Sequence, residues 1–448
     1  MVNYRIIRLT ALHGLNIGGV LYSQYPNFNQ KTYKEKLSCL FQASVLYSDS
    51  FSRSMNGLGN EAYEIVWDFA LLQQTWAEEN GIVYGPNNWQ YQILIEQIRR
   101  IQPDVIYFQG TEVAIPGRFF HRSHKNNLAT DLKSEFPFLR LVAMFSGFPT
   151  DIQRTVDVDV LFSCTPSIQN HYKQKGVSSV LCYHAFDPSI SIRLESIERM
   201  RDFTFVGSSR APESRYWVLR SLLEKTSIQL WLDEPENLQG YSHIDAVKKK
   251  IRQLISLLLR KFIKFVLSME IQRIQHFLAH SLLIPNRVRK AVRSIQIDIS
   301  VGNRIGTRLD LSKGNQSTKS LKEMSPDRCN LPVSGLDYYR ILQSSRVSFN
   351  KHTDFTGSSV GNMRMFEATG VGTCLLTDSG DNINDLFEPE HEVVTYSTVE
   401  EAIDKSKYLL ENEDVRQEIA HRGYIRTLKD HTIDNRCQLI DEVIQARL

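Results

Sequence analysis

The chain has 448 residues, of which 42% are hydrophobic and 23% are charged, and its formal net charge is +3. This length exceeds what one ordinary core supports and predicts two domains of a soluble globular protein. So small a net charge gives no reason to expect a nucleic-acid partner.

Cysteine usage and the apolar segments bear on location. The six cysteines are scattered and form no Cys-x-x-Cys pair, which argues against a zinc site and a disulfide framework. Charges interrupt the N-terminal apolar residues, so we expect no signal peptide. The most apolar region, 251–271, contains Arg260, Lys261 and Lys264, whereas a membrane span needs about 20 mostly apolar residues. We expect a cytoplasmic protein, either free or peripheral at the inner face of the membrane.

Residues 1–190 alternate strand-like and helix-like segments, as in a parallel sheet with crossover helices. Ligands bind such sheets at the carboxyl ends of the strands. No Gly-x-Gly-x-x-Gly follows the first strand, so a nicotinamide dinucleotide site is not expected. The predicted strands are 4–12, 104–108, 139–145, 158–162 and 180–183, and the predicted helices are 59–80 and 88–101.

A second alternating region begins near residue 203. Its predicted strands include 203–207 and 228–232, with a helix over 215–225 between them, and three helices close the chain over 399–412, 414–428 and 432–447. The alternation is interrupted by residues 241–310, which carry fourteen Lys and Arg against four acidic residues, a local net charge of +10. The positive charge is therefore concentrated in one tract.

Within that tract, residues 247–270 have helical spacing, with an apolar, partly aromatic face opposite a basic face. This pattern is typical of a helix that lies on an anionic lipid surface. It also fits a helix that packs on the protein body and exposes its basic face to water. Both interpretations stay open.

The most informative stretch is 361–378, Gly-Asn-Met-Arg-Met-Phe-Glu-Ala-Thr-Gly-Val-Gly-Thr-Cys-Leu-Leu-Thr-Asp. It predicts a short helix that runs into a buried strand and places Arg364 and Glu367 on neighbouring positions of one helical face. A helix N-terminus and an arginine can bind phosphate, and a glutamate can accept hydrogen bonds from a ribose diol. A nucleoside diphosphate is the ligand that this chemistry favours.

This stretch resembles the C-terminal domain of CgeB-like glycosyltransferases of the GT-B fold. The resemblance rests on Arg-x-Phe-Glu-Ala-x-Gly-x-Gly-x-x-Leu-Leu-Thr-Asp, continues at 386–389 and 392–396, and reaches back to 335–339, 346–352 and, less closely, 203–208. The segment 184–188 is similar to the turn that links the two domains of many such enzymes.

The resemblance implies an α/β fold in which two Rossmann-like, doubly wound domains face each other across a cleft. We expect an acceptor domain over 1–190 and a nucleotide-sugar domain over 191–448, with a basic helical insertion at 241–330 and terminal helices that return to the first domain. The implied donor-binding residues are Gly18, Gly207, Arg215, Asn350, Lys351, His352, Arg364, Glu367 and Gly370.

For an inverting transfer the enzyme needs a base near the acceptor hydroxyl. Glu112, at the end of the strand 104–108, is our candidate, with His13, His121, His124 and Asp151 as competitors. The single Asp-x-Asp tripeptide, Asp157 to Asp159, precedes a strand and is interpreted as a turn. We therefore expect neither a metal nor another cofactor.

We predict a metal-independent glycosyltransferase that moves a hexose-type sugar from a nucleoside diphosphate donor to a glycan or lipid-linked saccharide. Retaining enzymes of this fold carry a second glutamate eight residues before the ribose-binding one, and here that position is Ser359. Two alternatives therefore remain, a non-catalytic protein that binds sugar nucleotides and a sugar-nucleotide epimerase of the same fold.

Overall fold

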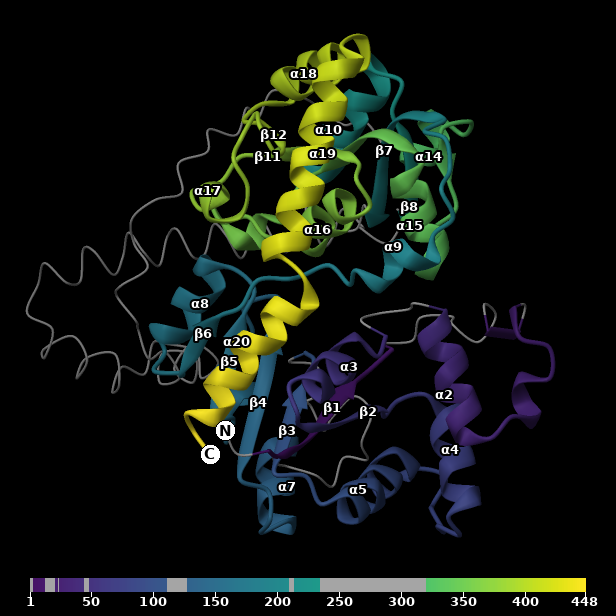
Figure 1. Cartoon of the computed structure of the whole chain (residues 1–448), viewed down its shortest axis with the longest axis vertical. Coiled ribbons are helices and arrows are strands. Elements are labelled where there is room, and N and C mark those ends of the chain that lie inside the picture. Colours follow the sequence, from purple (N-terminus) through teal and green to yellow (C-terminus); the bar gives the residue numbers. More distant parts are fainter. Residues whose placement is uncertain are drawn as a thin grey trace, which may run out of the picture. The chain divides into compact units, whose positions relative to one another are not determined.

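The computed structural model describes residues 3–12, 21–22, 24–43, 48–110, 127–208, 213–233 and 320–448. These residues form two six-stranded sheets, and every strand pair is parallel (Figure 1). The basic tract 241–310 and its helix 247–270 lie outside the described residues and stay predictions.

The first sheet has the strand order β2-β1-β3-β4-β5-β6. Strands β3 and β4 are buried along their whole length, which explains why they are continuous apolar runs rather than alternating ones. The five predicted strands are confirmed with shifts of at most two residues at their ends, and β2 is an additional strand. Their bounds are β1 Arg5–Thr10, β2 Glu61–Val66, β3 Val105–Phe108, β4 Leu141–Ser146, β5 Val160–Ser163 and β6 Ser179–Leu181.

The predicted helix 59–80 is wrong in its first half. Residues Glu61–Val66 form β2 at the edge of the sheet, and the helix α4 covers only Ala70–Glu79. Glu64 faces the interior, where its Oε2 accepts a hydrogen bond of 2.6 Å from Nε of Arg8 on the adjacent strand. A buried glutamate breaks the apolar alternation that predicts a strand, and only its partner on β1 makes it compatible with burial.

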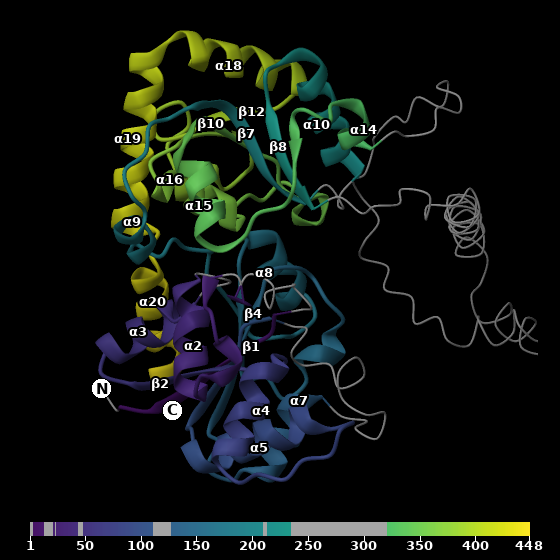
Figure 2. The same cartoon turned by 90° about the vertical axis from the view of Figure 1, so that its right-hand side faces the viewer.

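Helices cover the first sheet, and one of them comes from the end of the chain. Helix α20 lies against the first sheet (Figure 2). Its residues Cys437, Ile440 and Ile444 belong to the same core as Ile6 of β1. Asp441 accepts hydrogen bonds from Tyr4 and Asn60. These helices are α2 Tyr33–Gln42, α3 Ser50–Gly57, α4, α5 Trp89–Ile101, α7 Leu128–Glu135, α8 Pro166–Lys173 and α20 Ile433–Gln445, with short 3₁₀ turns η1 Phe28–Gln30 and η3 Ile152–Thr155.

The second sheet has the order β12-β11-β10-β7-β8-β9. Its strands are β7 Arg201–Ser208, β8 Gln229–Asp233, β9 Cys329–Asn330, β10 Ser345–Asn350, β11 Cys374–Asp378 and β12 Val394–Tyr396. The accompanying helices are α10 Glu213–Lys225, α14 Leu321–Met324, α15 Gly335–Gln343, α16 Met363–Gly370, α17 Ile383–Leu386, α18 Val399–Glu411 and α19 Glu413–Asp430, with the 3₁₀ turn η5 Asp354–Thr356.

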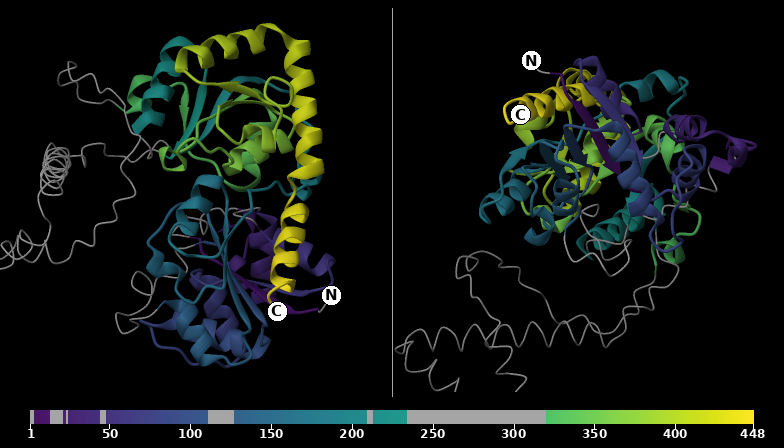
Figure 3. Two further views of the ribbon diagram at one scale, coloured as in Figure 1. Left: turned by 90° about the vertical axis from the view of Figure 1, so that its left-hand side faces the viewer. Right: turned by 90° about the horizontal axis from the view of Figure 1, so that it is seen from below.

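Two segments connect the region of the first sheet to that of the second, and they pair with each other. The long helix α19 ends at Asp430, and α20 begins three residues later (Figure 3). Between them, the carbonyl of His431 accepts the N–H of Phe186, whose own carbonyl accepts the N–H of Ile433. Phe186 precedes the short helix α9 Ser189–Arg193. The segment 184–188 is therefore fixed by the break between α19 and α20.

The ring of Phe186 leaves no room for a side chain at Gly370, the last residue of α16. A β-carbon at Gly370 would lie 2.3 Å from Cγ of Phe186, which is itself 1% exposed. The glycine is thus explained by close packing. Gly370, which the sequence predicts to bind the donor, is not among the residues that line the 490 Å³ cavity of the candidate site.

We predict that Gly370→Ala lowers the free energy of unfolding by about 1–3 kcal/mol, because the Phe186 ring must move. Denaturant unfolding at equilibrium measures this change. Gly57→Ala is the matched control, since Gly57 also ends a helix and a β-carbon there meets no atom within 4 Å. Equal free energies of unfolding for the two variants would contradict this prediction, because the Phe186 ring could then move without destabilising the fold.

Candidate functional site

A cavity of about 490 Å³ lies where strands of both sheets end. Gly147 and Cys164 follow β4 and β5 of the first sheet, and Thr353 lies three residues after β10 of the second. The cavity is therefore at the carboxyl ends of the strands, where the sequence predicts a ligand. The polar residues that line it from the region of the second sheet include Arg215, Tyr338, Tyr339, Arg364 and Glu367.

A second, larger cavity of about 690 Å³ flanks the edge strand β2. Three of its four charged side chains are in ion pairs, since Arg5 binds Glu61 and Glu64 binds Arg8, while Arg100 donates to Asn80 and lies over the Trp76 ring. This cavity lies beside the sheet rather than at the carboxyl ends of the strands. The smaller cavity is the better candidate because it lies at those ends and holds two arginines close together.

Two guanidinium groups line the smaller cavity and lie over the same aromatic ring. Cζ of Arg364 is 5.1 Å and Cζ of Arg215 is 5.9 Å from the centre of the Phe205 ring. Arg215 comes from the first turn of α10 and is 6% exposed, and Arg364 is the second residue of α16. The sequence predicted both residues for donor binding, and the structure brings them together.

Neither guanidinium lies within ion-pair distance of a carboxylate in the described part of the chain, although Glu367 lines the same cavity. Arg215 donates to the carbonyls of Ser208, at 3.0 Å, and Lys351, at 2.7 Å, while Nε of both Arg215 and Arg364 is buried and has no hydrogen-bond partner. Burial and the nearby charge of Arg364 lower the pKa of Arg215 to about 10. Buried charge without a counterion is costly, so this arrangement favours an anionic ligand.

Gly207, at the end of β7, provides the space for one of these groups. A β-carbon at this position would lie 2.7 Å from Nη2 of Arg364. The sequence analysis expected Gly207 to admit a diphosphate to the backbone. In the structure, a side chain at Gly207 would displace Arg364, which lines the cavity.

Glu367 lies on α16 and is 8% exposed. Its Oε2 accepts a hydrogen bond of 2.5 Å from the Tyr338 hydroxyl, and its Oε1 accepts one of 3.4 Å from that of Tyr339. Burial raises the pKa of Glu367, and the Tyr338 bond and the Arg364 charge offset part of this increase. The sequence analysis assigned no role to the two tyrosines. Their place in the segment 335–339, which belongs to the family pattern, could have indicated that they lie near the site.

Asn350 ends β10, and Lys351 and His352 follow it, so the three residues lie at the end of a strand as predicted, but the cavity lining does not include them. They hold the loop that leads to α16. Asn350 and Asn362 exchange two side-chain hydrogen bonds of 2.9 and 3.1 Å, and Asn362 does line the cavity. The structure thus makes these residues positioning residues for the cavity wall.

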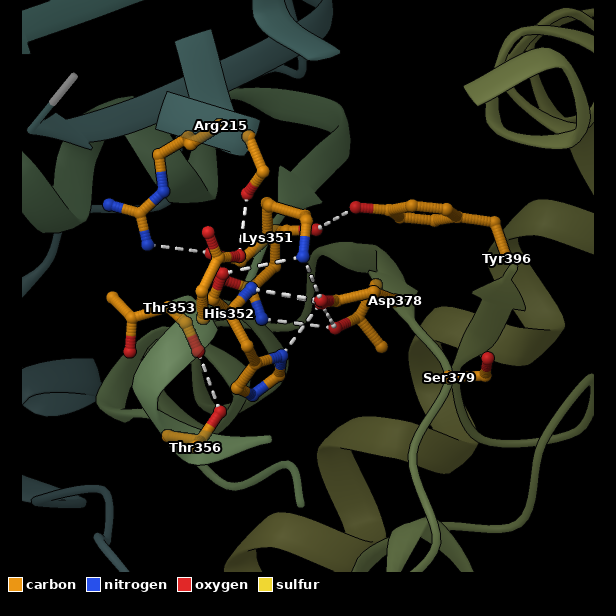
Figure 4. A network of polar contacts seen from close by, with 12 residues as sticks. Arg215, Lys351, His352, Thr353, Thr356, Asp378, Ser379 and Tyr396 are labelled. Atoms are coloured by element: carbon orange, nitrogen blue, oxygen red, sulfur yellow. Dashed lines mark hydrogen bonds and ion pairs between the residues drawn. The ribbon is translucent and has the colours of Figure 1, made fainter. Parts of the chain in front are cut away.

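His352 and Lys351 meet at Asp378, the last residue of β11 (Figure 4). Nζ of Lys351 lies 2.9 Å from the carboxylate, and Nδ1 of His352 lies 2.7 Å from it. On the other side of the ring, Nε2 accepts the backbone N–H groups of Gly361 and Asn362, at 3.0 and 3.2 Å. With Nε2 accepting these two N–H groups, Nδ1 is the ring nitrogen that donates to Asp378.

The remaining predicted residues cannot be placed in the site. Gly18 and Glu112, together with His13, His121 and His124, lie outside the described residues. The structure adds His184, which lines the cavity, and burial lowers its pKa to about 4, so its ring is neutral at physiological pH.

The described residues contain no group of three or more His, Cys, Asp and Glu that could hold a metal ion. Asp157, with φ of 59°, lies in a turn, and Asp159 pairs with Lys133 at 2.7 Å, so the interpretation of this tripeptide as a turn is confirmed. Over the same described ranges, no helix combines the length and the apolar character needed to cross a membrane.

We predict that Asp378→Asn lowers stability at pH 7 by about 1–3 kcal/mol, because Lys351 and His352 lose a charged acceptor. Burial alone would raise the pKa of Asp378, but His352 and Lys351 lower it below its ordinary value of 3.8. A depressed carboxyl pKa stabilises the fold above the unfolded-state pKa, and this contribution disappears as the pH falls through the folded-state value.

Urea unfolding from pH 7 down to the acid range measures this effect. Stability of the wild type should fall more steeply below about pH 4 than that of the variant. Asp404→Asn, at an exposed position on α18, is the control and should run parallel to the wild type. Parallel curves for Asp378→Asn as well would contradict the assigned role.

Comparison with known proteins agrees with this architecture. Residues 314–442 match the glycosyl transferase-like family, and this range contains Arg364, Glu367 and both tyrosines. No curated protein matches the sequence.

Two solved structures resemble the whole chain. HepE from Anabaena, in complex with UDP-glucose, is 11% identical with a TM-score of 0.50, and the match covers 99% of this chain and 100% of that one. Sucrose-phosphate synthase from Thermosynechococcus elongatus is 9% identical with a TM-score of 0.50, and the match covers 99% of each chain. The two sheets and these likenesses show the GT-B fold, with two Rossmann-like domains, as predicted.

Proposed function

We propose that the protein is a glycosyltransferase that uses a nucleoside diphosphate sugar as its donor. The observation that carries this proposal is a pair of guanidinium groups, that of the buried Arg215 and that of the partly buried Arg364. Both line one cavity and lie beyond ion-pair distance of any carboxylate among the described residues. A diphosphate supplies two adjacent anionic groups that such a pair can bind through charge-assisted hydrogen bonds.

The neighbours of the arginines fit the rest of a nucleotide. Glu367 lies one helical turn after Arg364 and faces the same cavity, so its carboxylate can accept hydrogen bonds from ribose hydroxyls. Tyr338 and Tyr339 orient this carboxylate. Since HepE, which resembles this chain in fold, was solved with UDP-glucose, UDP sugars are the first donors to test.

The chemistry then follows from charge placement. The acceptor oxygen forms a bond to the anomeric carbon, the bond from that carbon to the phosphate oxygen breaks with its electron pair, and the acceptor hydroxyl loses its proton to a base. The two arginines stabilise the negative charge that grows on the leaving diphosphate, in the role that a metal ion has in other transferases. Glu112 remains our proposed base.

The acceptor site is the less specified part of the proposal. Ser48, Ser50, Gly147 and Thr165 line the cavity from the first half of the chain and can bind hydroxyl groups of a glycan. We propose a polysaccharide or lipid-linked saccharide as acceptor, with residues 247–270 at an anionic membrane surface in the second case. Assignment to the CgeB-like enzymes belongs to the same proposal.

Ser359 supports one alternative, a protein of this fold that binds sugar nucleotides without transfer. It replaces the second glutamate of retaining enzymes, and its hydroxyl accepts the backbone N–H of Ser167 at 3.2 Å instead of lining the cavity. Release of free nucleotide from UDP sugars in the presence of a cell extract as acceptor source supports transfer. Tight binding without any release would favour the alternative.

We predict that Arg364→Ala and Glu367→Ala each weaken binding of a nucleoside diphosphate by about 1.5–3 kcal/mol, because each removes charged hydrogen bonds. Calorimetry with a panel of nucleoside diphosphates that includes UDP measures the loss. Arg340→Ala serves as control, since Arg340 is exposed on α15 and pairs with Asp337 outside the cavity. Unchanged affinity in both cavity variants would refute the site.

We also predict that sugar transfer continues at an unchanged rate in EDTA, because arginine side chains provide the positive charge that the leaving diphosphate needs. The rate is compared before and after chelation and again after addition of Mg²⁺ or Mn²⁺. Complete loss in EDTA with recovery on addition of either ion would contradict the proposed mechanism.

A further inference from the structure

A separate cavity of about 500 Å³ lies at the opposite end of α16. Val371 and Gly372, which follow the helix directly, line it together with the segment around Ser191 to Arg199 and one side of α19. It shares no lining residue with the cavity of Arg215 and Arg364. The proposed donor site therefore does not account for it.

The charged groups that line this 500 Å³ cavity are basic. Arg199 and Arg416 line it, with His421 at its rim, and no carboxylate is among its described lining residues. Arg199 donates to the carbonyls of Ser345 and Gly372 and to the Thr373 hydroxyl, which are all neutral acceptors. Burial and the nearby charge of Arg416 lower the pKa of Arg199.

The nearest carboxylate, that of Glu413, is shared among several donors. It pairs with Arg416 and also with Arg346, at 2.8 Å, and accepts a hydrogen bond from Gln417. Glu413 lies outside the cavity lining. Positive charge on the cavity wall therefore exceeds the negative charge available to it.

Two polar atoms of lining residues remain without a partner. Nε of Arg416 is a buried donor on a residue that is 1% exposed, and Oε1 of Gln343 is a buried acceptor. A purely structural role explains Arg199, since its bonds hold the turn after α16. Such a role leaves the free Nε–H of Arg416 and the free acceptor of Gln343 unexplained.

We propose that this cavity is a second binding site, for the phosphate group of a small polyhydroxylated metabolite. Arg199 and Arg416 bind the phosphate, and Gln343, Gln417 and Ser196 are placed around it to bind hydroxyl groups. The volume admits a sugar phosphate, and guanidinium groups favour phosphate over neutral sugars. The site stands whether or not the proposed donor site is correct.

The test is calorimetric titration with inorganic phosphate, glucose 6-phosphate and glucose. It is carried out in wild type and in an Arg364→Gln background, where the first cavity has lost one of its guanidinium groups. Gln417→Glu with His421→Glu places negative charge at two exposed positions on the rim, so the variant is expected to fold. Lys407→Glu, exposed on α18 away from the cavity, is the control for the same change in net charge.

We expect both phosphate compounds, but not glucose, to bind in the Arg364→Gln background. The double glutamate variant should weaken this binding by about tenfold or more through charge repulsion, and Lys407→Glu should leave it within about twofold. No binding in that background, equal affinity in all variants, or binding of glucose as tight as that of glucose 6-phosphate would overturn the second site. A failed donor site would instead appear as identical titrations in wild type and Arg364→Gln.

Discussion

The candidate site depends on two positive charges that lie close together, one on the buried Arg215 and one on the partly buried Arg364. Arg215 and Arg364 lie over the ring of Phe205, and neither has a carboxylate partner in the described part of the chain. Cation–π contacts hold both guanidinium groups, and two backbone carbonyls also accept hydrogen bonds from Arg215, but none of these contacts supplies a negative charge. A bound anion would satisfy both groups at once, and this is why we propose that the cavity binds a diphosphate.

A network anchored at Asp378 gives this arrangement its geometry. Asp378 receives Lys351 and His352, and His352 in turn accepts the two N–H groups that precede α16. The carbonyl of Lys351 accepts one of the Arg215 bonds. The ends of β10 and β11 thus fix both the helix that carries Arg364 and the side chain of Arg215, although none of these supporting residues lines the cavity.

Part of this could be predicted from the sequence. Strands with continuous apolar runs, such as β3 and β4, were predicted because burial on both faces requires such runs. The spacing of Arg364 and Glu367 on α16 placed both in one site, since residues three apart share a helical face. These predictions succeed where the local pattern alone determines the result.

The failures have a common cause in contacts between distant residues. The strand β2 was missed because its buried Glu64 is explained only by Arg8, which is 56 residues away. The sequence predicts donor binding by Gly370, but it does not reveal that this position packs against Phe186, on a segment remote in the sequence. Asn350, Lys351 and His352 were placed correctly along the chain, and only the structure shows that they face Asn362 and Asp378 rather than the cavity.

The most direct measurement is a crystal structure of the protein with a bound nucleoside diphosphate such as UDP. The account predicts phosphate oxygens within about 3 Å of both the Arg215 and Arg364 guanidinium groups, and ribose hydroxyls at the Glu367 carboxylate. Density for the nucleotide elsewhere, with both arginines still without an anionic partner, would contradict the central claim.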